Sequence, residues 1–171
     1  MAYSPADLFA LIEGDLRPWV EQEKNGRLSI AADPFEVQEL LGEAPGRFRV
    51  ILAWDGDESI GHHRTGVVAH KLRVIVSHNR GLAVLKGSNL SASRANDAPL
   101  MRLATEVRDR VRTINLPNIE SGRQLQYLGC EPMSIETEGR GFQLDAYQLT
   151  FRLPAAITRL SGGDYRPPAN S

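Results

Sequence analysis

The stretch Val67–Asn79, which reads VVAHKLRVIVSHN, decides the fold. One set of alternating positions holds Val68, His70, Leu72, Val74, Val76 and His78. The intervening set holds Val67, Ala69, Lys71, Arg73, Ile75 and Ser77. Because successive strand residues point to opposite sides, this pattern predicts a β-strand with one mostly apolar face and one more polar face. Such half-covered sheets are usually antiparallel or mixed, with helices packed on the apolar side.

Two other segments alternate in the same way and predict neighbouring strands. Segment 48–54 places on one face Phe48, Val50, Leu52 and Trp54. Segment 145–153 directs inward Tyr147, Leu149, Phe151 and Leu153. Shorter strands are expected at 28–31 and at 125–135, the second of them bulged by Pro132. The chain therefore predicts a sheet of about four to five strands.

The clearest helical pattern runs from about Pro99 to Ile114, with Asn96 or Asp97 as its N-cap. Its apolar stripe comprises Leu100, Leu103, Ala104, Val107, Val111 and Ile114. Between the stripe positions the residues are mostly charged, as in a helix with one buried face. We therefore expect a long amphipathic helix here that braces the sheet.

Two helices are expected before the first long strand. Ser4 and Asp7 form a capping-box pattern at the start of the chain, and Gly14 and Pro18 favour a bend or break further on. A brief helix is expected over 33–42, and it begins with an Asp-Pro pair. The order of elements predicts an α+β fold, an antiparallel or mixed sheet with helices packed on one face.

Length and composition fit one globular domain, because 171 residues suffice for a single well-buried core. We assign residues 1–160 to this domain and interpret 161–171, rich in Gly, Pro and small polar residues, as a disordered tail. The formal net charge of −1 disfavours a generic nucleic-acid-binding domain. No apolar run approaches the ~20 residues of a membrane span, and no signal pattern opens the chain, so we expect no membrane partner and a cytosolic start.

The densest polar cluster lies in an expected loop, Asp55–Gly66, between the two strongest strands. It comprises Asp55, Asp57, Glu58, His62 and His63. One interpretation is a solvated surface loop. The other is a divalent metal site in which Asp55, Asp57 and His62 activate water, as in a metal-dependent hydrolase.

A second candidate is the expected loop 80–98, which is long for a compact domain and rich in Ser, Asn, Gly and Arg. Its candidate contact residues are Arg80, Lys86, Arg94 and Asn96. These residues either keep the loop soluble or contact phosphates or an acidic protein surface.

The sequence presents no catalytic constellation. His70 and His78 lie roughly 26 Å apart along an extended strand, so they cannot share a ligand. The single cysteine, Cys130, excludes an internal disulfide and a zinc-ligand pattern, and its position beside Gly129 favours plain packing. We therefore expect no cofactor and a structural protein rather than an enzyme.

The order of these elements resembles that of the tail terminator (tail completion) proteins of long-tailed bacteriophages. The resemblance covers most of residues 5–157 and rests on a succession of elements. These are the N-terminal helix, strand 48–54, strand 67–79 leading into Arg80-Gly81-Leu82, helix 99–114, the Tyr127-Leu128-Gly129 strand and the final strand 145–151. Residues 26–46 add a short helix that this pattern does not require.

Such a resemblance implies a structural virion protein that forms a hexameric ring on the last ring of the tail tube. The ring ends tube polymerisation and joins the tail to the head-completion or neck proteins, with the sheath protein as a further possible neighbour. Genomic DNA only passes through the lumen, and the Asp55–Gly66 loop would contact another layer or line that lumen. Assembly takes place in the host cytoplasm before the protein becomes part of the virion. Sheet edges that pair between subunits would supply main-chain hydrogen bonds.

Three other interpretations remain open at this stage. Another phage neck component, a head-completion or connector protein, would be built from similar small α+β parts. The metal-dependent hydrolase described above is an enzyme alternative. A monomeric binding module is the third, and the mass of the native protein in solution separates it from a ring.

Overall fold

A computed structural model of the 171-residue chain describes residues 4–42, 48–59, 68–79, 90–117, 124–134 and 144–156. The helical elements are α1 (Pro5–Pro18), the π-helix η1 (Trp19–Glu23), α2 (Pro34–Gly42) and α3 (Leu90–Thr113). The strands are β1 (Arg27–Ala31), β2 (Phe48–Ser59), β3 (Val68–Asn79), β4 (Gln126–Ser134) and β5 (Leu144–Ala156). The tail 161–171 lies outside the described residues.

The strands form one five-stranded sheet in the order β1-β2-β3-β5-β4, which confirms the predicted mixed sheet and α+β class. The stretch that decides the fold is its central strand, β3, which pairs antiparallel with β2 on one side and β5 on the other. β4 continues the antiparallel pairing at one edge. β1 pairs parallel with β2 at the other edge, since the crossover through α2 separates these two strands in the chain.

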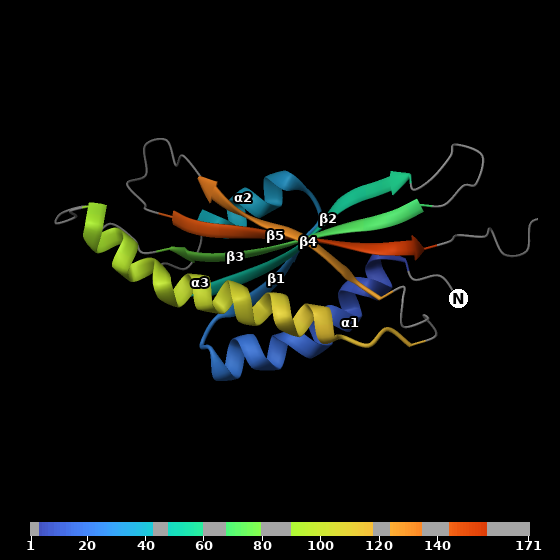
Figure 1. Ribbon diagram of the computed structural model, residues 1–171, viewed down its shortest axis with the longest axis horizontal. Coiled ribbons are helices and arrows are strands. Elements are labelled where there is room, and N and C mark those ends of the chain that lie inside the picture. The colour runs from blue at the N-terminus through green and yellow to red at the C-terminus, as the bar shows by residue number, and fades with distance from the viewer. Residues whose placement is uncertain are drawn as a thin grey trace, which may run out of the picture.

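The larger core lies between the sheet and the pair α1 and α3, which Figure 1 shows below the sheet. It holds the predicted inward residues Val50, Leu52, Leu72, Val74, Val76, Leu149, Phe151 and Leu153. The predicted stripe of α3 faces them, with Leu100, Leu103, Ala104, Val107 and Val111 buried. Burial of this apolar area, worth about 25 cal/mol per Å², is the main stabilising contribution to the fold.

A smaller core lies on the opposite face, under α2, which Figure 1 shows above the sheet. Val37 and Leu41 of α2 pack there against Ile51 and Ile75, the residues that alternate with the main-core positions. The prediction that all helices pack on one face of the sheet is therefore wrong. α1 and α3 share one face, but α2 packs on the other. A connection between parallel neighbours has to cross one face of the sheet, and α2 is that connection.

The N-terminal helix begins at the predicted capping box and breaks at one of the two predicted positions. Ser4 and Asp7 form the capping box, in which the Asp7 backbone N–H donates to the Ser4 hydroxyl at 3.2 Å. The α-helix passes through Gly14, and the break comes at Pro18, where the wider π-helix follows. Asn25 then adopts a φ of 52°, and the Gly26 N–H donates to the Val20 carbonyl at 2.9 Å, which ends the helix.

Two glycines in this region are expected to respond oppositely to alanine. A Cβ on Gly26 would lie 3.0 Å from the Phe48 carbonyl oxygen and 3.1 Å from Val20, so Gly26→Ala should lower the free energy of unfolding by about 1–3 kcal/mol. Gly14 has nothing within 4 Å of the same position, so Gly14→Ala should raise it by about 0.5–1 kcal/mol. Chemical denaturation of both variants checks this, and equal effects would contradict it.

Two element boundaries differ from the sequence-based expectation. β2 continues through Asp55 to Ser59, so the expected loop Asp55–Gly66 begins as strand. α3 begins at Leu90, not after a cap at Asn96 or Asp97, so residues 90–98 of the expected loop are helical and Pro99 lies inside the helix. The expected bulge in β4 lies between Tyr127 and Gly129 instead of at Pro132.

In the part of the chain that is described, no helix has the length and apolar character needed to cross a membrane.

Candidate functional site: the sheet edges and the polar face

The acidic candidates Asp55 and Asp57 point to opposite faces of the sheet. Asp55 forms an ion pair with Arg73 at 3.0 Å and lies 3.9 Å from Lys71, on the face that α2 partly covers. Asp57 lies opposite His70 in the register, and its carboxylate is 2.5 Å from His70 Nδ1 on the main-core side. The bulge between Trp54 and Asp57 brings about this separation, because it shifts the alternation of side chains.

This arrangement does not fit the metal-dependent hydrolase. Asp55 and Asp57 would have to converge on one ion, and each instead meets a basic or imidazole group on its own face. Among the described residues no group of His, Cys, Asp and Glu side chains is placed to hold a metal ion. His62 and His63, the other members of the predicted cluster, lie outside the described residues.

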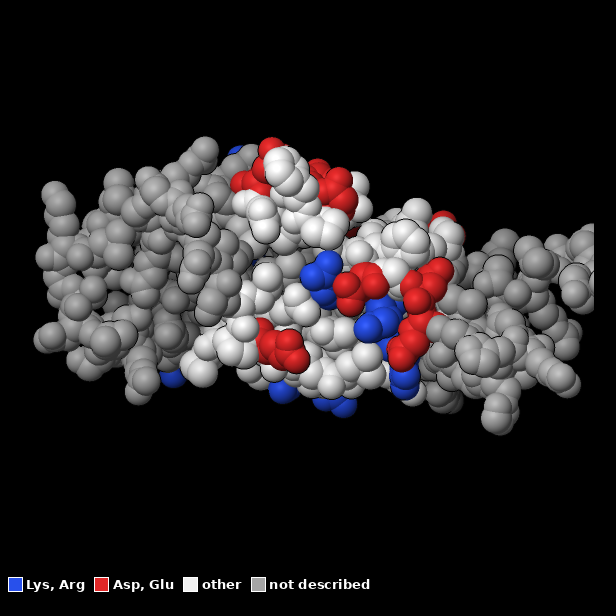
Figure 2. Space-filling view, turned by 90° about the horizontal axis from the view of Figure 1, so that it is seen from above, with Lys and Arg blue, Asp and Glu red and all other residues white. Residues whose placement is uncertain are grey.

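The third acidic candidate, Glu58, belongs to a set of charged and amide side chains that we call the polar face. Its members are Asp55, Glu58, Lys71, Arg73, Gln126, Gln148 and Arg152. Arg152 lies 3.8 Å from Glu58 and donates to the Gln126 side chain at 3.0 Å. Figure 2, which views the molecule from the side of α2, shows acidic and basic side chains next to one another there. Such exposed pairs contribute only about 0–1 kcal/mol each, and their charges largely compensate.

The predicted contact loop 80–98 is not a single loop. Arg94 and Asn96 lie in the first turns of α3, where the backbone is helical. Arg80 and Lys86 lie outside the described residues. The four residues therefore do not form one described site, and their role as contacts to a partner stays a prediction.

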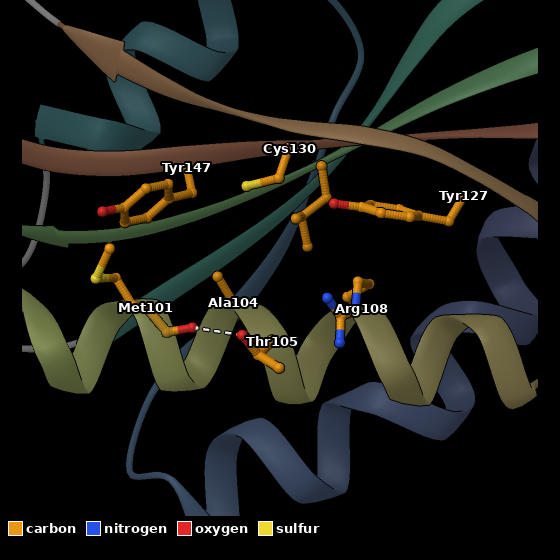
Figure 3. Close-up of a pocket in the computed structure, with 8 residues that line it drawn as sticks. Met101, Ala104, Thr105, Arg108, Tyr127, Cys130 and Tyr147 are labelled. Carbon is orange, nitrogen blue, oxygen red and sulfur yellow. Dashed lines mark hydrogen bonds between the residues drawn. The ribbon is translucent and has the colours of Figure 1, made fainter.

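A groove that the sequence did not reveal runs between α3 and the β4 edge of the sheet. It encloses about 170 Å³ and is lined by Met101, Ala104, Thr105, Arg108, Tyr127, Cys130, Tyr147 and Leu149. Figure 3 shows the α3 side chains facing those of Tyr127, Cys130 and Tyr147 across it. We call this hollow the α3–β4 groove. Most of its lining is apolar or aromatic, and Arg108 lies over the Tyr127 ring at 5.8 Å.

The groove changes the acidity of two groups that line it. Partial burial raises the pKa of the Cys130 thiol, although Arg108 opposes the rise. Burial also raises the pKa of Tyr127, and Arg108 again acts in the opposite direction. A thiol whose pKa is raised carries less thiolate at neutral pH. Cys130 is exposed at the groove, so the plain packing expected from the sequence is wrong.

We expect the rate of Cys130 alkylation to depend on pH with a midpoint above that of the unfolded chain. The folded environment disfavours the thiolate, so a higher pH is needed to form it. The midpoint is measured with iodoacetamide on the folded protein and on the same protein in urea. Shielding of the thiol by the fold lowers the alkylation rate at every pH but does not move the midpoint. The midpoint therefore reports the acidity of the thiol alone. A folded midpoint at or below the unfolded one would contradict the described environment.

At the other edge of the sheet two large apolar side chains are exposed on the main-core face. Ile30 of β1 is 36% exposed and Trp54 of β2 is 45% exposed. Both continue rows of buried residues, since Ile30 lies opposite Leu52 and Trp54 follows Leu52 by two residues. We call Ile30 and Trp54 the edge patch. Exposed aromatic side chains beside a sheet edge are typical of surfaces that contact another protein.

Both edge strands are poorly suited to continuous pairing with another strand. β1 has only five residues, and the Leu28 carbonyl already accepts from Arg17 at 3.2 Å. β4 carries Pro132 and a bulge that leaves Leu128 45% exposed. These are the devices by which natural sheets prevent uncontrolled edge-to-edge aggregation. Contact at either edge would therefore rest mainly on side chains.

The fold and these surfaces define a mixed α+β protein with two dissimilar, partly apolar sheet edges. Comparison of the chain with protein-family models finds no match, and comparison with curated proteins finds none either.

Proposed function

We propose that this chain is a ring-forming structural subunit of the tail terminator type, which caps a phage tail tube and joins it to the neck. One observation supports this proposal above the others. The edge patch and the α3–β4 groove are both exposed and partly apolar, they differ in shape, and they lie at opposite edges of one sheet.

Two different surfaces at opposite ends of a subunit are what a head-to-tail assembly requires. An interface of this kind joins unlike patches, and it closes into a ring when the rotation per subunit divides a full turn. A two-fold dimer would need one patch that complements itself. The resemblance in the order of elements supplies the particular ring, a hexamer at the end of a tail tube, and its neighbours, which are the tail tube protein and a neck protein.

The polar face fits the same proposal. Its charges pair within the subunit, and it offers exposed hydrogen-bonding groups to a neighbouring layer of the assembly. The candidate loops near Arg80 and His62 follow β3 and β2 directly in the chain, and they are candidates for the contacts to tube or neck.

Electron microscopy of the purified protein, alone and with polymerising tail-tube subunits, tests the proposed function. We expect closed rings with an open centre, and tubes that stop growing once a ring is bound at one end. Closed rings that leave tube growth unchanged would favour another neck component. Isolated particles of subunit size under all conditions would contradict the ring.

A further inference from the structure

The edge patch and the α3–β4 groove lie in the same two rows of side chains across the sheet. One row runs from Trp54 through Leu72 and Phe151 to Tyr127. The next runs from Ile30 through Leu52, Val74 and Leu149 to Cys130. Each row therefore begins at an exposed residue of the patch and ends at a residue of the groove. Both ends lie on the face that α1 and α3 cover.

We propose that the groove of one copy of this chain binds Trp54 and Ile30 of the next copy. This inference rests on the proposed ring and specifies which surfaces join its subunits. A neighbour placed beside the β4 edge continues the same rows on the same face. The β1 strand of that neighbour would then run antiparallel to β4. The reason is that β1 is parallel to β2, and the three further pairs across the sheet, β2–β3, β3–β5 and β5–β4, are all antiparallel.

The chemistry of the two surfaces is complementary. The groove is lined mainly by apolar and aromatic groups and has one guanidinium, that of Arg108, over Tyr127. A tryptophan ring bound there would add apolar contact and a second aromatic face for that cation. Asp57 follows Trp54 on the same face and is 41% exposed, so its carboxylate, which contacts His70 within its own subunit, would also lie towards the arginine side of the groove. The exposed thioether of Met101 adapts readily to such a partner.

Cysteine cross-linking tests the contact, because the chain has a single cysteine, Cys130, and it lies in the groove. Ile30→Cys adds a second thiol at the far end of the Cys130 row. With a short thiol-to-thiol cross-linker we expect a ladder of covalent trimers and larger species. Such a ladder requires each chain to join two neighbours. Phe35→Cys is the matched control, since Phe35 is 70% exposed but lies on α2, on the opposite side of the sheet.

The outcomes separate this inference from the proposed function. A ladder with Ile30→Cys and none with Phe35→Cys supports the contact. If the wild-type protein assembles, three results would overturn the contact and leave the ring in place. These are no ladder with Ile30→Cys, equal ladders with both variants, or only dimers through Cys130. Wild-type protein that stays monomeric, together with an Ile30→Cys variant that gives no ladder, would overturn both.

A second pair of variants measures the strength of the contact. Trp54→Ala is expected to weaken association between subunits by about 30-fold, because buried tryptophans dominate interfaces of this kind. Phe35→Ala removes a more exposed aromatic ring and should leave association unchanged. Unfolding curves that match wild type establish that both variants fold. Equal loss of association in the two, or no loss in Trp54→Ala, would overturn the assignment of the edge patch.

Discussion

Leu103→Asp is expected to unfold the protein. Leu103 is 4% exposed and lies in the middle of the α3 stripe that covers the sheet. A carboxylate there would be taken from water into an apolar core with no partner of opposite charge, and the burial of unpaired charge is among the few changes that cost more than about 4–5 kcal/mol. A domain of this size is stable by only about 5–15 kcal/mol, so most of that margin would be lost.

The neighbouring substitution Arg102→Asp is the control for charge and helix position. Arg102 is exposed, so the same carboxylate one residue earlier should change the free energy of unfolding by no more than about 0.5 kcal/mol. Circular dichroism and urea denaturation of the two variants provide the measurement. A folded, cooperative Leu103→Asp variant would show that α3 does not cover the sheet as described.

Phe151→Ala is expected to lower the free energy of unfolding by about 3–5 kcal/mol without abolishing the fold. Phe151 is fully buried in β5, and its ring centroid lies 5.5 Å from that of Tyr127 in a tilted arrangement. Removing the ring leaves a cavity at the centre of the main core and withdraws support from one wall of the α3–β4 groove. The effect should therefore extend to association between subunits.

Phe35→Ala makes the same chemical change at a position 70% exposed, and it should alter stability by no more than about 0.5 kcal/mol. The comparison of the two variants by urea denaturation isolates the effect of burial from that of losing a phenyl group. Similar losses of stability in both would contradict the assignment of Phe151 to the core.

The strands and the core of the main helix were predictable because their signals are periodic over many residues. Val74 and Val76 of β3 alternate with residues of the other face, and Leu103 and Val107 recur at helical spacing. Periodicity of this length reflects which face is buried, and the structure buries these residues. The capping box of Ser4 and Asp7 was equally predictable, because its hydrogen bonds are local in the chain.

One of the two misplaced boundaries is explained by contacts within the sheet. Asp55–Ser59 is polar and glycine-bearing, which is typical of a loop, but Arg73 and His70 on the adjacent strand pair with its carboxylates. The polar sequence before Pro99 carries local signals of a helix start, yet α3 extends to Leu90. Local propensities amount to less than about 1 kcal/mol for most residues, so pairing with β3 can override them in β2. The described contacts give no explanation for the earlier start of α3.

The candidate surfaces depend on strand order, and a single sequence does not carry strand order. Trp54 alternates with buried residues and so was assigned to the apolar face, which is where it lies. Trp54 is exposed because β2 is next to the edge strand β1, and β1 is too short to reach it: their pairing ends at Ala53. The α3–β4 groove arises in the same way, since it joins Met101 and Tyr127 from segments far apart in the chain.

The central claim is that copies of this chain join side by side through unlike edges into a closed ring. The mass of the wild-type protein in solution, measured by light scattering over a range of concentrations, tests it most directly. We expect a discrete species near six times the subunit mass of 18.9 kDa, with no larger species as concentration rises. A mass that stays at 18.9 kDa, or stops at a dimer, would contradict it.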